Sequence, residues 1–229
     1  MSDATRAKVG SFIQSGDRRY GKIERPTVVP QPSSADAAAT TAVSAKNAQI
    51  FAGVVLGLHG PPAEGAEGAR KLMSHFVDWN EVRVSRPTTL VAALGRTPRS
   101  AERIALLQRF LEAYFLRQRS LNLDYLFTLK SHEARRFVSD LEIFDREELA
   151  AVALTGFNIA VFPPSEVLRD AAEHAGLIRP KTTALQMAKK FETTLEELTL
   201  YTLYSHLYSH AHDAEKNESE GKRKVAAKR

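Results

Sequence analysis

Apolar residues recur three and four positions apart along most of the chain between residues 47 and 212, which is the spacing of amphipathic helices. No stretch of useful length alternates apolar and polar residues as a half-buried strand would. The widest apolar face falls in residues 100–118 and consists of Ile104, Leu107, Phe110, Leu111, Tyr114 and Phe115. The pattern predicts an all-α protein with residues 100–118 as its central helix.

Glycine and proline residues, which interrupt helices, divide the rest of this region into further helices. Residues 47–60 predict a buried helix, which the Gly-Pro-Pro sequence at residues 60–62 ends. Residues 67–80 predict a second helix, and residues 132–139 predict a shorter one.

Capping residues mark three later helix starts. Asp145 can accept hydrogen bonds from the free amides of the helix that follows it, and Glu148 three positions later completes a capping box. Ser165 is placed to cap a helix that ends at Gly176. The last predicted helix begins near Thr194.

The formal net charge of +5 is concentrated in the two tails. Residues 1–46 hold seven basic and four acidic residues, residues 47–212 hold nineteen of each, and residues 213–229 hold six and four. The first segment is rich in Pro, Ser and Ala, so we expect a disordered linker or arm. The last segment is a charged basic tail, which either aids solubility or serves as an electrostatic arm for nucleic acid.

The composition excludes several kinds of chemistry. The chain has no cysteine, so disulfides, thiolate nucleophiles and cysteine-ligated iron–sulfur clusters are absent. His206 and His210 have the spacing of two zinc ligands on one helix face, but no further metal-binding motif accompanies them, and we expect no metal and no cofactor. No apolar stretch reaches membrane-spanning length and the N-terminus does not resemble a signal peptide. We therefore expect a cytoplasmic protein, associated with the nucleoid if it binds DNA, and no membrane partner.

Three strings within residues 47–213, together with the helix order, resemble the endonuclease III type of helix-hairpin-helix DNA glycosylase. They are FVDWNEV at residues 76–82, LEIFDREELAAVALTGFNIAVF at residues 141–162 and PPSEVLRDAAEHAGLI at residues 163–178. The resemblance implies a two-lobed helical protein that clamps bent double-stranded DNA and flips a damaged base out of the duplex for excision.

The hairpin departs from the pattern of these glycosylases. Members of the family use glycines there, because backbone amides must approach a DNA phosphate closely. The matching residues here are Ile143, Phe144, Asp145 and Arg146, which include no glycine and add a carboxylate. We expect this phosphate-binding turn to be lost.

The residues that the resemblance assigns to catalysis are also replaced. Glu147 stands where bifunctional members have a lysine, and a carboxylate cannot form a Schiff base with a sugar. Pro164 or, with one gap, Ser165 stands where active members have an aspartate. Glu166 is then the one nearby acid that offers a catalytic candidate, although a glutamate at a helix start commonly stabilises the helix dipole.

Basic residues before and within the hairpin are the candidates for contact with the DNA backbone. They are Arg117, Arg119, Lys130, Arg135, Arg136 and Arg146. They form either a basic rim or ordinary solvated helix faces. His59 stands near the place where the family has a glutamine that fills the gap left by a flipped base, and it is either a base probe or a polar residue at a helix end.

Three functions remain open on these residues. The first is a DNA-associated member of the base-excision-repair glycosylase superfamily without catalytic activity. The second is an active but divergent monofunctional DNA glycosylase that uses Glu166. The third is a helical module that binds a protein partner and no DNA, which the neutral charge of residues 47–212 would permit.

Overall fold

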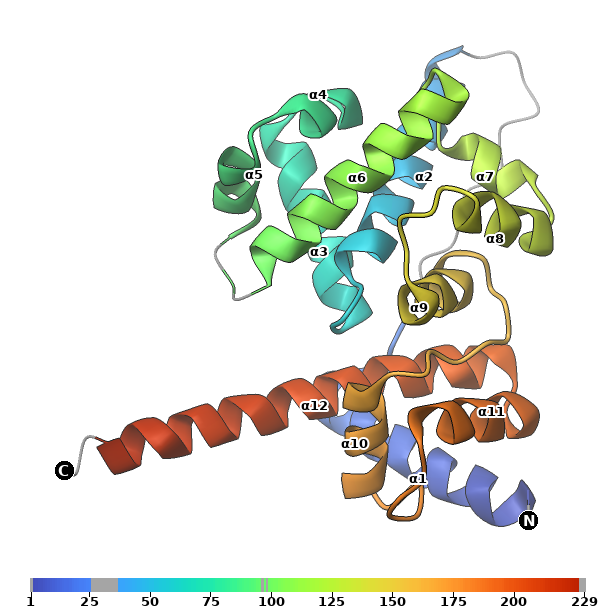
Figure 1. Ribbon diagram of the computed structural model, residues 1–229, viewed down its shortest axis with the longest axis vertical. Coiled ribbons are helices and arrows are strands. Elements are labelled where there is room, and N and C mark those ends of the chain that lie inside the picture. Colours follow the sequence, from blue (N-terminus) through green and yellow to red (C-terminus); the bar gives the residue numbers. More distant parts are fainter. Residues whose placement is uncertain (1, 26–36, 96, 98, 227–229) are drawn as a thin grey trace. The chain divides into compact units, whose positions relative to one another are not determined.

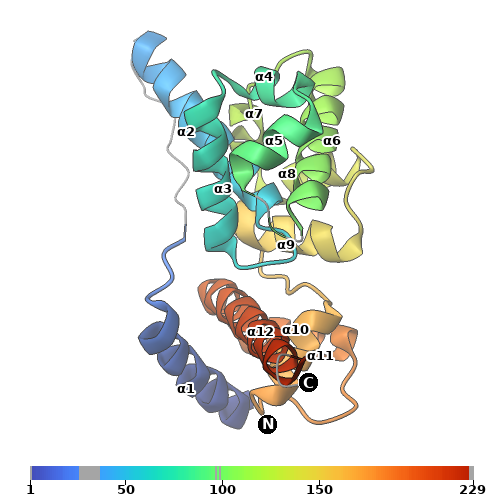
Figure 2. The same cartoon turned by 90° about the vertical axis from the view of Figure 1, so that its left-hand side faces the viewer.

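A computed structural model describes residues 2–25, 37–95, 97 and 99–226. The regular structure of these residues is helical throughout, with twelve helices and no strand, which confirms the all-α prediction. The chain divides into two compact units (Figures 1 and 2). The terminal unit comprises Met1–Glu24, His59–Pro61 and Ala160–Arg229, and the central unit comprises Arg25–Leu58 and Pro62–Ile159.

The central unit is built around the helix that has the widest apolar face in the sequence. This helix, α6 (Ser100–Gln118), has the predicted bounds and buries Ile104, Leu107 and Phe110 completely. It packs against α2 (Ala37–Leu56), α4 (Trp79–Val84) and α5 (Pro87–Leu94). The unit is completed by α3 (Pro62–His75), α7 (Asp124–Thr128), α8 (Ser131–Ser139) and α9 (Arg146–Gly156).

Glycines allow α2 and α3 to pack in direct backbone contact. A Cβ atom on Gly65 of α3 would overlap the carbonyl oxygen of Gly53 and the backbone of Gly57, both on the α2 side of the contact. Only hydrogen fits at Gly65, because the atoms that a side chain would meet are backbone atoms that cannot rotate away.

The prediction of one helix over residues 67–80 is wrong. Helix α3 ends at His75 and α4 starts anew at Trp79, because Asp78 takes the N-cap position. The Asp78 carboxylate accepts a hydrogen bond of 2.7 Å from the Glu81 amide, and the Glu81 carboxylate accepts one of 2.7 Å from the amide of Val77. This local pair of bonds outweighs the apolar periodicity that runs through the break.

The terminal unit consists of α1 (Ser2–Tyr20), α10 (Glu166–His174), α11 (Ala184–Thr194) and α12 (Glu197–Ala226). Helix α12 packs against the other three, and α1 also packs against α11. The helix expected from Thr194 begins instead at Glu197, and α11 was not predicted. Thr183 and Gln186 form the capping box that starts α11.

The prediction of a disordered N-terminal arm is wrong for residues 2–20, which form α1. Val9 of α1 is 1% exposed, and Asp17 Oδ1 lies 2.9 Å from Nε2 of the fully buried His206 on α12. Tyr20 donates a hydrogen bond of 3.0 Å to Asp213. The apolar face of α1 is too narrow to stand out in the sequence, and it becomes stable by packing on a distant segment.

The charged C-terminal segment is helical as far as Ala226, as part of α12. Residues 37–46 of the expected linker belong to α2, while its residues 26–36 and the end of the basic tail at residues 227–229 lie outside the described residues.

Two glycines of α1 provide a matched test of this docking. An alanine Cβ at position 16 would lie 2.6 Å from the His206 ring, whereas nothing lies within 4 Å of one at position 10. We expect Gly16→Ala to speed amide hydrogen exchange throughout α1. Gly10→Ala should slow exchange slightly, since alanine favours a helix by about 0.5–1 kcal/mol over glycine. Rapid exchange of α1 in the unmodified protein would contradict the docking itself.

Candidate nucleic-acid interface

The turn between α8 and α9 is closed by hydrogen bonds to its own carboxylates. Asp145 is the N-cap of α9, and its Oδ1 accepts a hydrogen bond of 2.8 Å from the Glu148 amide. In return, Glu148 Oε2 accepts one of 2.9 Å from the Asp145 amide. The predicted capping box is confirmed. Within the turn, Glu142 has a left-handed backbone with φ of 55°, a conformation that favours glycine.

This capping box leaves little scope for a phosphate at the start of α9. A free helix N-terminus binds anions through unpaired amides and the positive end of the helix dipole. Here the Asp145 carboxylate already bonds to such an amide, and it brings a negative charge to the place where a phosphate would carry its own. The start of α9 is therefore capped by the protein's own side chains.

The first turn of α9 contains Glu147, which the resemblance matches to the lysine of bifunctional glycosylases. Glu147 lies in this turn and is half-buried. The sequence contains no lysine from residue 131 to residue 180. The loss of imine chemistry stays a prediction, and it rests on the match of Glu147 to the lysine of the family.

The start of α10 makes Ser165 the N-cap residue, with Pro164 immediately before it. Ser165 is 1% exposed, its amide donates a hydrogen bond of 2.9 Å to the carbonyl of Pro163, and its hydroxyl forms no capping bond. The preceding segment is anchored by Glu192 of α11, whose Oε1 accepts a hydrogen bond of 2.8 Å from the amide of Phe162. Neither Pro164 nor Ser165 supplies a carboxylate to this helix start.

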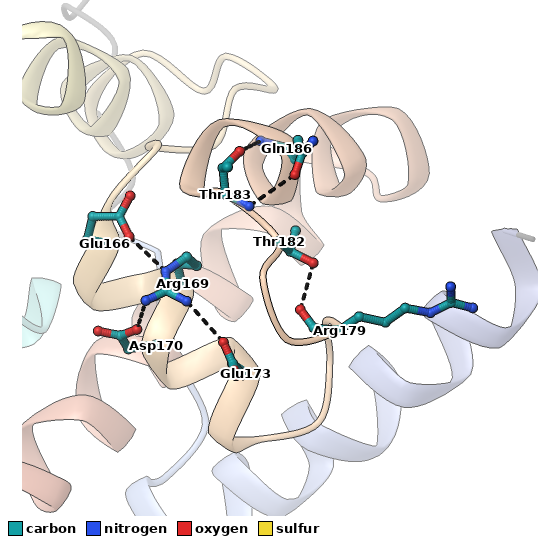
Figure 3. Close-up of polar contacts among 8 residues, drawn as sticks. All are labelled: Glu166, Arg169, Asp170, Glu173, Arg179, Thr182, Thr183 and Gln186. Carbon is teal, nitrogen blue, oxygen red and sulfur yellow. Dashed lines mark hydrogen bonds and ion pairs between the residues drawn. The ribbon is translucent and has the colours of Figure 1, made fainter.

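Glu166 points into a surface cluster around Arg169 (Figure 3). Its Oε2 accepts a hydrogen bond of 2.7 Å from Arg169 Nε, while its side chain is 70% exposed. Arg169 also binds Asp170 and, at 3.0 Å, Glu173. The hydrogen bond to Glu166 raises the pKa of Arg169. An exposed carboxylate already paired with an arginine lacks the apolar surroundings that keep a catalytic acid protonated.

The structure brings Arg117 of α6 together with the end of α8. The Arg117 guanidinium lies over the ring of Phe137, with its carbon 4.6 Å from the ring centroid. Its Nη2 is 3.5 Å from Oδ2 of Asp140, which is the long end of the hydrogen-bond range. The exposed fractions of the Arg117 and Asp140 side chains are 41% and 47%.

The other predicted contact residues of the central unit are exposed basic side chains. Among the residues that the structure describes, none forms an ion pair with any of Arg119, Lys130, Arg135, Arg136 and Arg146. Arg119 is the left-handed C-cap of α6, Lys130 precedes α8, and Arg146 opens α9. His59 belongs to the terminal unit, where it lies in the turn after α2 with φ of 61°.

Carboxylates of the same region are occupied by local bonds. Glu133 accepts a hydrogen bond of 3.0 Å from the Lys130 amide, Asp140 contacts Arg117, and Asp145 and Glu148 cap α9. Residues 117–147 hold six basic and six acidic residues, so the region has no net charge. Several acidic side chains in and beside this range nevertheless bind the protein itself, among them Glu133, Asp140, Asp145 and Glu148, whereas five basic ones face solvent without an ion pair to a described residue.

Sequence reasoning missed one exposed aromatic residue of this surface. Tyr125 of α7 is 42% exposed, and its ring lies 5.6 Å from that of Phe137 at an interplanar angle of 70°. Helix α7 has five residues, too few for an apolar period to appear, so the sequence offered only an isolated tyrosine.

The histidines of α12 serve the packing of the terminal unit. His206 pairs with Asp17, and His210 packs edge-on against Phe12 with ring centroids 6.0 Å apart. Burial lowers the pKa of His210. No group of three or more His, Cys, Asp or Glu in the described part of the chain is arranged to hold a metal ion. The cysteine-bound cluster found in the glycosylase family does not fit a chain that has no cysteine.

None of the described helices has both the length and the apolarity to cross a bilayer.

Comparison with known proteins identifies the fold. No family model matches the chain. No curated protein sequence matches it. Among solved structures, the chain is similar to a trapped endonuclease III–DNA covalent intermediate, the estranged-adenine complex, with a TM-score of 0.51 and 9% sequence identity over 88% of this chain and 84% of that one. The protein therefore has an endonuclease III-like helical fold, and at this identity the likeness concerns the fold alone.

The capping box at the hairpin can be tested by its effect on stability. We expect Asp145→Ala to lower the free energy of unfolding by about 1 kcal/mol, because the Glu148 amide loses its partner. Asp145→Asn should cost much less, since an asparagine side chain also caps helices. Urea denaturation measures both, and equal losses for the two variants would argue against the capping role.

Proposed function

We propose that the protein binds double-stranded DNA through exposed arginine and lysine side chains of α6, α8 and α9 and that it does not catalyse base excision or strand cleavage. The observation that carries the proposal is a contrast in the central unit: carboxylates are bonded internally, whereas five basic side chains form no ion pair with a described residue. The similarity to an endonuclease III solved with DNA supports nucleic acid as the partner.

The proposed contact surface comprises Arg117, Arg119, Lys130, Arg135, Arg136 and Arg146. Long basic side chains can reach phosphates without the close backbone approach that a glycine hairpin provides. Binding of this type depends on release of counterions from DNA, so it is strongly salt-dependent and insensitive to base sequence. His59 lies in the terminal unit, and we assign it no part in this surface.

The absence of catalysis rests on the two helix starts. The α10 start offers Pro164 and Ser165 in place of a carboxylate, and Glu166 is exposed and paired with Arg169. The α9 start offers Glu147 in place of an amine. Neither start supplies the groups that would stabilise a developing sugar cation or form a Schiff base.

The DNA-binding surface predicts a difference between two double variants. Arg135→Ala with Arg136→Ala should weaken binding to a blunt duplex and lower the slope of log affinity against log salt by about two. The control is Arg70→Ala with Lys71→Ala, which removes the same charge from α3 where both side chains pair with Glu67. Fluorescence anisotropy over a salt series measures both, and no salt-dependent binding of the unmodified protein would contradict DNA binding.

The loss of catalysis predicts a negative trapping result. Borohydride should yield no covalent complex between the protein and a duplex that contains an abasic site, because no amine is placed for imine formation. Incubation with a panel of damaged duplexes should release no free base. Release of a base that Glu166→Gln abolishes would support the alternative of an active glycosylase with Glu166 as its acid.

A further inference from the structure

We propose that the surface around Phe137 binds unpaired nucleotides of single-stranded DNA beside the duplex. The surface, called here the Phe137 patch, consists of Arg117, Tyr125, Arg136 and Phe137. This inference rests on the proposed binding of duplex DNA and adds a second kind of contact, which is stacking on exposed bases.

Two planar groups meet at Phe137 from different helices. Arg117 of α6 lies over the ring at 4.6 Å, and Tyr125 of α7 packs edge-to-face at 5.6 Å. Phe137 itself is 6% exposed, so these two groups and Tyr114, at 5.8 Å, cover it. Arg117 of α6 and Tyr125 of α7 therefore both contact the ring of Phe137 on α8 (Figure 1 shows the three helices).

The outer parts of both planar groups are open to solvent. The Arg117 side chain is 41% exposed and Tyr125 is 42% exposed. The Tyr125 hydroxyl has no hydrogen-bond partner among the described residues. Aromatic rings and guanidinium planes are the groups on which unpaired bases stack, and this stacking tolerates any base.

Charge near the patch favours a polyanion as the occupant. Arg136 precedes Phe137 on α8 and shares a helix face with Asp140, which is the residue that Arg117 contacts at 3.5 Å. Arg136 thus lies four positions from the carboxylate that Arg117 contacts. Arg119 and Lys130, which form no ion pair with a described residue, lie at the end of α6 and the start of α8. Phosphates of a strand whose bases stack on the patch would meet these cations.

An intact duplex offers no exposed base faces that could stack on the Phe137 patch. The faces of bases inside a duplex are covered by their neighbours, so neither Tyr125 nor the Arg117 plane can stack on them without unstacking. A strand with unpaired bases presents those faces freely. The patch therefore selects a single-stranded segment, whereas the arginines of α8 and α9 act equally on any phosphate backbone.

The test compares a blunt duplex with the same duplex carrying an oligothymidine tail, by anisotropy with the full chain. The tail should strengthen binding about tenfold. Tyr125→Ala should abolish this gain and keep the affinity for the blunt duplex. Tyr125→Phe is the matched control and should retain the gain, because the hydroxyl bonds to no described residue. Arg117→Lys, which keeps the charge and removes the plane, should lose part of it.

Three other outcomes would be decisive. A tail that adds nothing, or a gain that survives Tyr125→Ala, overturns the inference and leaves the proposed function intact. No binding of the blunt duplex contradicts the proposed function instead. Competition by polyglutamate as effective as that by oligothymidine would assign the patch to acidic proteins and overturn the inference. If Tyr125→Ala lowers the thermal unfolding temperature, Arg117→Lys decides between loss of stacking and loss of fold.

Discussion

Two reciprocal hydrogen bonds between Asp145 and Glu148 determine what the hairpin can do. They start α9, satisfy two of the amides that a helix N-terminus leaves unpaired, and hold a carboxylate at the positive end of the helix dipole. The same position in a glycine hairpin would be open to a phosphate. In this chain the capping bonds stabilise α9, and the same bonds occupy two amides that would otherwise be available to bind an anion.

Side-chain chemistry follows from that constraint. With the Asp145 and Glu148 amides bonded, the proposed contact with DNA falls to basic residues that form no ion pair with a described residue, namely Arg119, Lys130, Arg135, Arg136 and Arg146. Their neighbours Glu133 and Asp140 are held by local bonds. The region has no net charge, but several of its acidic side chains are bonded within the protein and these basic side chains form no ion pair with a described residue. Glu166, the acid that the sequence offered as a catalytic candidate, is likewise bonded to Arg169.

The sequence predicted those features that depend on neighbours along the chain. The bounds of α6 follow from its apolar period, and the start of α9 follows from Asp145 and Glu148. The sequence did not predict the features that depend on packing between distant segments. Helix α1 is stabilised by α12 through Asp17 and His206, which are 189 residues apart. The contact of Arg117 and Tyr125 with Phe137 joins three helices, and no spacing in the sequence reports it.

The most direct measurement is an amide and arginine side-chain NMR titration of the protein with a blunt DNA duplex. Binding through side chains predicts changes in the Nε–Hε signals of Arg135 and Arg136, with the backbone amides of Asp145 and Glu148 unmoved because their protons stay bonded to each other's carboxylates. The contrary result would be the largest shifts at those two amides, since that would mean that the capping box opens and the hairpin binds phosphate through its backbone.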